Sequence, residues 1–495
     1  MTARALMLQG TGSDVGKSVL VAGLCRLAQQ QGLRVAPFKP QNMSNNAHAC
    51  SAGGEIGRAQ ALQAQAAGIE ASVDLNPVLL KPETDRTAQV VVHGQVYRRQ
   101  DAANYMQDRN TLLPYVLESF ARLSKQYDLI IVEGAGSAAE VNLRAGDIAN
   151  MGFARAAGVP VSLIGDIDRG GVIASLIGTK QVLDPADAAY IQTFLINKFR
   201  GDRSLFDDGV RIIEAQTGWS CLGVLPWLAS PSRLPAEDAV VLDQQTARSK
   251  PQNLKIVAPM LPHLANFDDV DPLRLEPDVN FEFIPPGRPL PRDADAVLLL
   301  GTKSTIADLE FVRAQGWHHD LYAHARNGGY ILGICGGYQM LGKAIVDVGQ
   351  TDGTSSSAPG LGLLDVTTQM ANTKRVRPIN TNCAYSKHAV SGYEIHMGKT
   401  MGPDTSRPLF LGDEVSDGAQ SESKRVQGTY LHGIFGNDAY RSWWLGQISG
   451  KSVRRYAYQS HVEQALDDLA TALNTHCDTK ALLAAAKPVG WHPAT

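Results

Sequence analysis

The feature that most constrains the fold is a repeated alternation of short β-branched runs with longer helical stretches over the first half of the chain. The runs expected to form strands are Ala5–Gln9, Arg34–Phe38, Leu129–Glu133, Val159–Asp166, Thr193–Lys198 and Leu222–Trp227. The helices expected between them are Gly16–Gln31, Glu55–Ala67, Asn104–Lys125, Asp147–Ala157, Val172–Leu183 and Phe206–Thr217. Such alternation predicts βαβ units, a parallel sheet and ligands bound at the carboxyl ends of its strands.

A second series of the same kind follows a stretch without periodicity. Residues 231–252 are rich in proline, charge and glutamine, and are interpreted as a linker. Further strand-like runs and a helix come after it, at Leu254–Leu261, Val279–Pro285, Asp295–Gly301 and Thr305–Gln315. The sequence therefore predicts an α/β protein with one unit over residues 1–230, a second over 253–447 and a helical C-terminal segment over 448–495.

Composition narrows the function classes. The net charge is −3 and 19% of residues are charged, so nothing indicates a nucleic-acid partner or a membrane surface. No apolar run approaches the roughly 20 residues of a membrane span. The six cysteines are scattered without a C-x-x-C pair, which argues against a disulfide framework or a zinc site and favours a cytoplasmic location. The sequence carries no signal for a particular oligomeric state.

The segment GTGSDVGKS, at Gly10–Ser18, follows the first predicted strand. Its glycines let backbone N–H groups turn toward an anion, and the next helix begins where its dipole favours phosphate. The strict phosphate-loop pattern requires glycine six residues before the lysine, and this chain has Thr11 there. A glycine-rich turn with a chance Lys-Ser is the alternative. The residues expected to bind a nucleotide are Gly10, Thr11, Gly12, Gly16, Lys17 and Ser18.

Polar residues at other strand ends support a nucleotide site. Glu133 ends a buried strand where a metal-binding acid belongs, and Asp166 and Asp168 end a later one, where one of them is expected to cap a helix. We expect Ser18, Glu133 and Asp166 as ligands of Mg²⁺. Lys39 ends the second strand beside several side-chain amides. This segment is either a solvated loop or part of a substrate pocket that faces the γ-phosphate, and we expect the pocket.

Asn197, in NKFRGD, lies where a base-recognition loop is expected, although it also fits a structural role. Together these segments resemble the dethiobiotin-synthetase-like family of ATP-dependent ligases. In that family the loop reads Gly-Thr-x-x-x-x-Gly-Lys-Thr/Ser, which Gly10, Thr11, Gly16, Lys17 and Ser18 match. The resemblance covers about residues 1–230 and implies ATP, Mg²⁺ and phosphoryl transfer to a carboxylate oxygen.

Cys335 lies between Gly333 and Gly337, after a predicted strand and before a predicted helix. This is the thiol version of a nucleophile elbow, in which small neighbours permit a strained turn that exposes the side chain. A buried, inert cysteine is the alternative. A nucleophilic cysteine needs a base, and His432, which ends the run TYLH, fits that role better than His396.

The region from Leu254 to Phe435 resembles the class I glutamine amidotransferase family, with Cys335 as nucleophile and His432 as base. Most members carry an acid two residues after the histidine, where this chain has Ile434. The third member of the triad is therefore open, with Glu394 a weak candidate. The resemblance implies that the loop Gly301–Thr305 lies on the oxyanion side.

The order of the two units and the motifs FKPQNMSNN, VEGAGS, GDIDRGG, GTKST, GICGGYQMLG and GTYLHGIF resemble the cobyric acid synthase family over nearly the whole chain. The resemblance implies ATP- and glutamine-dependent amidation of the b, d, e and g carboxylates of adenosylcobyrinic acid a,c-diamide. An acyl phosphate would accept ammonia released at the Cys–His site.

Two alternatives remain. One is a related ligase, either cobyrinic acid a,c-diamide synthase or an enzyme acting on a cell-wall lipid precursor. The segment FKPQNMSNN argues against both, because it matches the pattern of the cobyric acid synthase family. The other is a non-catalytic or partitioning ATPase with a degenerate amidotransferase module. That class usually carries an additional lysine early in the loop, and Gly10–Gly12 has none.

Overall fold

The predicted parallel sheet is present in the N-terminal part of the chain. In the computed structural model its strands lie in the order β12 (Ser220–Pro226), β11 (Ile191–Phe199), β10 (Val161–Asp166), β1 (Arg4–Gly10), β9 (Leu129–Glu133) and β2 (Val35–Phe38), all parallel. Residues 3–83, 87–235, 254–349, 357–412, 415–453 and 455–493 are described. Alternate side chains of β1 enter separate apolar cores, Ala5 and Met7 on one face and Leu6 and Leu8 on the other. This two-sided burial explains the unbroken apolar runs of the sequence.

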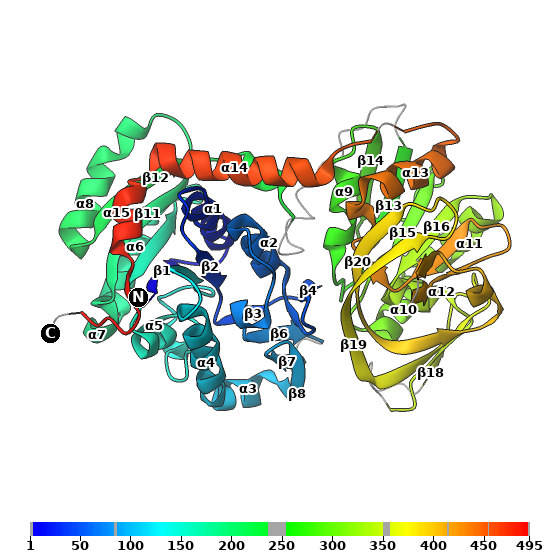
Figure 1. Cartoon of the computed structure of the whole chain (residues 1–495), viewed down its shortest axis with the longest axis horizontal. Helices are drawn as coiled ribbons and strands as arrows, with labels where there is room; N and C mark the ends of the chain where they lie inside the picture. The colour runs from blue at the N-terminus through cyan, green and yellow to red at the C-terminus, as the bar shows by residue number, and fades with distance from the viewer. Residues whose placement is uncertain are drawn as a thin grey trace.

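Helices cover both faces of this sheet (Figure 1). The helices of this unit are α1 (Lys17–Gln30), α2 (Arg58–Ala67), α3 (Ala102–Asp108), α4 (Leu113–Ser124), α5 (Met151–Ala157), α6 (Val172–Val182), α7 (Pro185–Ala188) and α8 (Asp207–Thr217). The stretch predicted as one helix over Asn104–Lys125 is divided by a 3-10 turn at Arg109–Leu112, and Pro114 stands at the start of α4. Proline is favoured in a first helical turn and disfavoured inside a helix, which explains the division.

A small second sheet beside β2 lies where no strands were expected. It contains β3 (Gln41–Met43), β6 (Val78–Pro82), β7 (Thr87–Val92) and β8 (Gln95–Asp101). The short hairpin of β4 (Ala47–Ala49) and β5 (Glu55–Gly57) precedes α2, so the helix predicted from Glu55 begins three residues later.

The second unit is built on the sheet β14 (Val279–Ile284), β13 (Leu254–Pro259), β15 (Ala296–Leu299), β16 (Tyr330–Ile334), β24 (Val426–Thr429) and β23 (Ala419–Gln420). Only β23 is antiparallel to its neighbour. Its helices are α9 (Asp271–Arg274), α10 (Thr305–Ala314), α11 (Trp317–Arg326), α12 (Gly336–Leu341) and α13 (Asp438–Ser449).

A long hairpin crosses the side of the second unit that faces the first (Figure 1). Its strands are β19 (Thr367–Cys383) and β20 (Ala389–Met401). The same sheet contains β17 (Ala344–Val346), β18 (Ser357–Pro359), β21 (Phe410–Gly412), β22 (Val415–Asp417) and β25 (Leu431–His432). Tyr393 and Ile395 of β20 pack with Ala47, Ala49, Leu79 and Val91 in an apolar cluster that joins the two units.

The C-terminal segment returns to the first unit. Helix α14 (Tyr458–His476) runs along the top of Figure 1 from the second unit and packs on α1, where Arg26 forms ion pairs with Glu463 (2.9 Å) and Asp467 (2.7 Å). After α15 (Thr479–Ala485), β26 (Lys487–Pro488) pairs antiparallel with β1. The predicted linker, residues 231–252, lies outside the described residues from position 236 onward.

Candidate active sites

The glycine-rich segment after β1 folds as a loop closed over a lysine. Nζ of Lys17 donates hydrogen bonds to the carbonyl oxygens of Gly12 and Gly136, each at 2.9 Å. Gly16 precedes α1 with φ +97°, and a Cβ there would collide with the side-chain amide of Asn197. Nδ2 of Asn197 donates to the carbonyl oxygen of Val15 at 2.9 Å. Asn197 therefore supports the loop backbone, and its predicted contact with a nucleotide stays a prediction.

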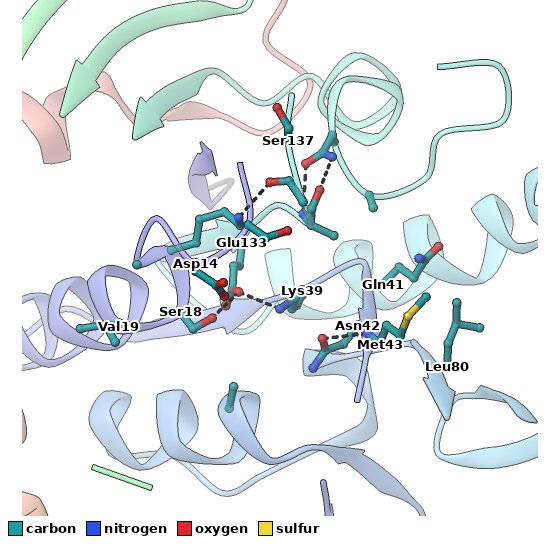
Figure 2. A pocket seen from close by; sticks show the side chains of 18 of the residues that line it. Asp14, Ser18, Val19, Lys39, Gln41, Asn42, Met43, Leu80, Glu133 and Ser137 are labelled. Carbon is teal, nitrogen blue, oxygen red and sulfur yellow. Dashed lines mark hydrogen bonds and ion pairs between the residues drawn. The ribbon is translucent and has the colours of Figure 1, made fainter. Parts of the chain in front are cut away.

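Glu133, at the end of β9, is fully buried and joins three segments. Its Oε1 accepts hydrogen bonds from Ser18 Oγ and Lys39 Nζ, each at 2.7 Å, and its Oε2 accepts one from Gln63 Nε2 at 2.6 Å. Figure 2 shows Ser18 and Lys39 converging on this carboxylate. The predicted metal ligands Ser18 and Glu133 thus meet beside Lys39, and their oxygen atoms are of the kind that Mg²⁺ prefers.

Asp166 is engaged with other partners. Its Oδ2 lies 2.7 Å from Nζ of Lys198, and its Oδ1 accepts a hydrogen bond from the backbone N–H of Asp168. Within the described ranges, no cluster of three or more His, Cys, Asp or Glu side chains is arranged to hold a metal ion. A magnesium ion at Ser18 and Glu133 would therefore complete its shell with phosphate or water oxygens.

A cavity of about 1180 Å³ opens from this loop. Lys17, Ser18, Lys39 and Glu133 line one part of it. The other part has an apolar wall made by Met43, Leu80, Val90, Tyr105, Met106 and Val141. Figure 2 shows Met43 and Leu80 on the side of the cavity away from Ser18. Met43 is 60% exposed and Val141 44%, so part of this wall is available to a ligand.

Cys335 forms the predicted elbow between β16 and α12. Its backbone has φ +52° and ψ −109°, a combination that non-glycine residues rarely adopt and that is typical of functional sites. A Cβ on Gly337 would overlap the carbonyl group of Leu299, and one on Gly333 would meet the backbone of Gly337. The neighbouring glycines therefore let β15, β16 and α12 approach closely enough to hold this turn.

His432, at the end of β25, is buried beside Cys335 and Asp269. Nδ1 of His432 lies 2.7 Å from Oδ2 of Asp269, whose Oδ1 accepts the backbone N–H of Gly433 at 2.7 Å. Burial alone would lower the pKa of His432, but Asp269 and a hydrogen bond with Cys335 outweigh burial and raise the pKa to about 10. An imidazolium beside a thiol favours the thiolate, which is the nucleophilic form.

The loop Gly301–Thr305 borders this pair. A Cβ on Gly301 would lie 3.3 Å from Cε1 of His432 and 3.8 Å from Cβ of Cys335. Oγ1 of Thr302 donates a hydrogen bond to buried Asp308. Lys303 forms an ion pair with Glu83 of the first unit at 3.2 Å. The predicted oxyanion-side loop is thus held in place by contacts from both units.

The two units of the chain match two domain families. Residues 6–241 match the CobQ/CobB/MinD/ParA nucleotide binding domain, and residues 255–440 match the CobB/CobQ-like glutamine amidotransferase domain. A protein of Hyphomonas neptunium named cobyric acid synthase is 59% identical over 494 residues, covering 100% of both chains. The chain belongs to the cobyric acid synthase family. Members from Rhizobium johnstonii (56% identity, 97% of this chain and 98% of the relative) and Paracoccus denitrificans (58%, 98% and 100%) carry the same name.

Membership of the cobyric acid synthase family confirms several predictions made from sequence. The α/β fold, the nucleotide-binding first unit and the glutamine amidotransferase second unit are confirmed. So is the assignment as a glutamine-dependent amide ligase of cobalamin synthesis. In the part of the chain that the structure describes, no helix is long and apolar enough to cross a membrane.

Two polar contacts of this family member were missed from sequence. The carboxylate on His432, which the sequence left open, is Asp269, from the 3-10 turn Phe267–Val270, and not the weak candidate Glu394. Glu394 forms an ion pair with Arg377 at 2.9 Å instead. Gln63, which bonds Glu133, was also missed. Neither Asp269 nor Gln63 belongs to a local motif, and each meets its partner only through the fold.

Proposed function

We propose that this chain amidates the b, d, e and g carboxylates of adenosylcobyrinic acid a,c-diamide, using ATP and glutamine. The observation that carries the proposal is the size and lining of the cavity beside Lys17 and Ser18. Small-molecule pockets typically measure about 300–1,000 Å³, and this cavity measures about 1180 Å³. It has room beyond the phosphate loop for a large second substrate, and its apolar wall suits the face of a ring system.

In the proposed ligase reaction, Lys17 and the loop Gly10–Gly16 bind the phosphates of ATP, and Lys39 orients the γ-phosphate toward the substrate carboxylate. A Mg²⁺ held by Ser18 and Glu133 would neutralise phosphate charge, and Asp166 would join it only by exchanging its ion pair with Lys198 for the metal. A carboxylate oxygen attacks the γ-phosphorus and ADP leaves. Ammonia then displaces phosphate from the acyl phosphate, which gives the amide. The apolar wall at Met43, Leu80 and Tyr105 is proposed to contact the corrin ring.

In the proposed glutaminase reaction, Cys335 attacks the side-chain amide of glutamine and forms a thioester with release of ammonia. His432 gives its proton to the departing nitrogen and then activates the water that hydrolyses the thioester. Asp269 keeps the imidazole ring in the required orientation. Backbone N–H groups of the Gly301–Thr305 loop and of the turn after Cys335 are proposed to stabilise the oxyanion.

We further propose the domain limits 1–230 for the ligase, 231–252 for the linker, 253–447 for the glutaminase and 448–495 for the C-terminal segment. A cytoplasmic location is also proposed, because all six cysteines are free thiols, as expected in a reducing compartment.

The test is incubation of the protein with ATP, Mg²⁺, the a,c-diamide and either glutamine or an ammonium salt. Mass spectrometry should detect stepwise replacement of OH by NH₂. Cys335→Ala should abolish amidation from glutamine and retain amidation from ammonium, whereas Lys17→Ala should abolish both. Full glutamine-dependent turnover by Cys335→Ala, or ammonium-dependent turnover by Lys17→Ala, would contradict the corresponding site.

A further inference from the structure

Helix α2 belongs to the ligase unit, yet its first residue contacts the glutaminase site. Nε of Arg58 lies 2.7 Å from Oδ2 of Asp268, with the two side chains 18% and 8% exposed. Asp268 directly precedes Asp269, the residue that contacts His432. Both acids belong to the single 3-10 turn Phe267–Val270, so a force on Asp268 is transmitted to Asp269 through one peptide bond.

The position of Arg58 is fixed from the ligase side. Its backbone N–H donates to the carbonyl oxygen of Asn46 at 3.1 Å. One and a half turns further along α2, Gln63 donates to Glu133 Oε2 at 2.6 Å and to the carbonyl oxygen of Ser18 at 3.2 Å. The span from Arg58 to Gln63 is about 7.5 Å along a regular helix. A single rigid element therefore connects the nucleotide loop to the turn that carries Asp269.

Further contacts anchor Asn266, the residue that precedes the same turn. Oδ1 of Asn266 accepts a hydrogen bond from the backbone N–H of Ala47 at 3.2 Å, and its Nδ2 donates to the carbonyl oxygen of Ala47 at 3.1 Å. Nδ2 of Asn266 also lies 3.2 Å from Oη of Tyr393, whose ring stacks on His432. The ligase unit thus contacts both Asn266, which precedes the Phe267–Val270 turn, and Asp268 within it.

The charges explain why a cation is needed at Arg58. Asp268 and Asp269 are adjacent carboxylates, and both are buried. Burial and the charge of Asp269 raise the pKa of Asp268, while Arg58 opposes this rise. Without the guanidinium, Asp268 would either repel Asp269 or compete with it for the proton of His432.

We propose that Arg58 is a positioning residue for the glutaminase reaction, because its ion pair with Asp268 fixes the turn that presents Asp269 to His432. The inference rests on the proposed function of Cys335 and His432. It means that the ligase unit supports the glutaminase triad from outside. The second unit therefore depends on the first for full glutamine hydrolysis.

The experiment measures glutamine hydrolysis and ammonium-dependent amidation by the full chain in parallel. Arg58→Met should lower the kcat for glutamine by up to about 100-fold, the effect of a small displacement of a catalytic group. The KM for glutamine and the ammonium-dependent rate should stay close to wild type. Arg58→Lys, which keeps the charge, should have an intermediate kcat. The matched control is Arg26→Met, because Arg26 also pairs with two acids but lies on α1 and faces α14, away from the glutaminase site.

A double variant separates charge from packing. Arg58→Met with Asp268→Asn should hydrolyse glutamine faster than Arg58→Met alone, because the unpaired carboxylate beside Asp269 is gone. A double variant no faster than the single one, or a wild-type kcat in Arg58→Met, would overturn the inference. Cys335→Ala separates the proposed glutaminase site from the proposed role of Arg58. If Cys335→Ala still hydrolyses glutamine, the proposed function fails. If Cys335→Ala is inactive while Arg58→Met is fully active, only the role of Arg58 is refuted.

Discussion

Oδ2 of Asp269 lies 2.7 Å from Nδ1 of His432, although 163 positions separate the two residues in the chain. Both side chains are almost fully buried, so water does not screen the contact. Asp269 stands in a turn between β13 and β14, whereas His432 ends β25 of the other sheet of the second unit. The pair therefore exists only when both sheets have assembled around Cys335.

The first prediction concerns this pair. Asp269→Asn should lower glutamine-dependent kcat by about 10²- to 10⁴-fold, because an amide at this place selects the wrong tautomer of the imidazole and stabilises its charge poorly. Ammonium-dependent amidation should be unaffected. Glu394→Gln is the control, since Glu394 is buried in the same unit but pairs with Arg377. Equal losses in the two variants would argue against a specific role for Asp269.

The second prediction is a pH dependence of stability. The folded-state pKa of His432, about 10, lies above the ordinary value of 6.5. The contribution of its charged pair is therefore complete below about pH 6.5 and is lost as pH rises toward 10. The difference in Tm between wild type and His432→Gln should be larger at about pH 6 than at about pH 10. A Tm difference that stays constant or grows with pH would contradict the raised pKa of His432. In an Asp269→Asn background the Tm difference should depend less on pH.

Local motifs account for the parts of the molecule that were predicted from sequence. The loop at Lys17 and the elbow at Cys335 are each specified within about ten neighbouring residues, because a strand, glycines and a helix start impose the turn. The strands and helices of the first sheet were also recognised, since their apolar periodicity is strong. Sequence distance explains the misses: Asp269 and Gln63 act on partners far along the chain.

The missed hairpins have a different cause. Strands β7, β8, β19 and β20 mix polar and charged residues with apolar ones, for example QVYRRQD in β8 and TKRVRPINTN within β19. Three of them contact the other unit: Val91 of β7 packs with Tyr393 of β20, and Lys374 of β19 forms an ion pair with Glu55. The burial of β7, β19 and β20 depends on the contact between the two units, and β8 is mostly exposed, so the sequence of each segment alone does not predict these strands.

The third prediction concerns that contact. Glu55 is 1% exposed and accepts ion pairs from Lys81 at 2.9 Å and from Lys374 of β19. Burial would raise the pKa of Glu55, but the two ammonium groups lower it to about 2, so the carboxylate is charged. Burial lowers the pKa of Lys374 to about 7 although Glu55 opposes this, so Glu55→Gln should leave Lys81 without its acid and Lys374 largely neutral. The loss should destabilise the protein by about 3–5 kcal/mol, measured by denaturant unfolding.

The control for Glu55 is an exposed pair of the same chemistry. Arg34 and Asp128 form an ion pair at 2.6 Å, and their side chains are 68% and 44% exposed. Asp128→Asn should therefore lower the free energy of unfolding by only about 0–1 kcal/mol. A cost for Glu55→Gln within that range would mean that the buried network contributes little to the joining of the two units.

The fourth prediction tests the elbow through its glycines. Gly337→Ala places a methyl group on the carbonyl of Leu299, so either β15 or α12 must shift and carry Cys335 with it. Such overpacking costs about 1–3 kcal/mol or more, and glutamine-dependent turnover should fall while ammonium-dependent turnover persists. Gly178→Ala, in α6, is the matched control, because a Cβ there meets no atom within 4 Å and helix propensity favours alanine by up to about 1 kcal/mol. Wild-type glutaminase activity in Gly337→Ala would show that the reaction tolerates movement of the turn, and the strained backbone of Cys335 would then have no catalytic meaning.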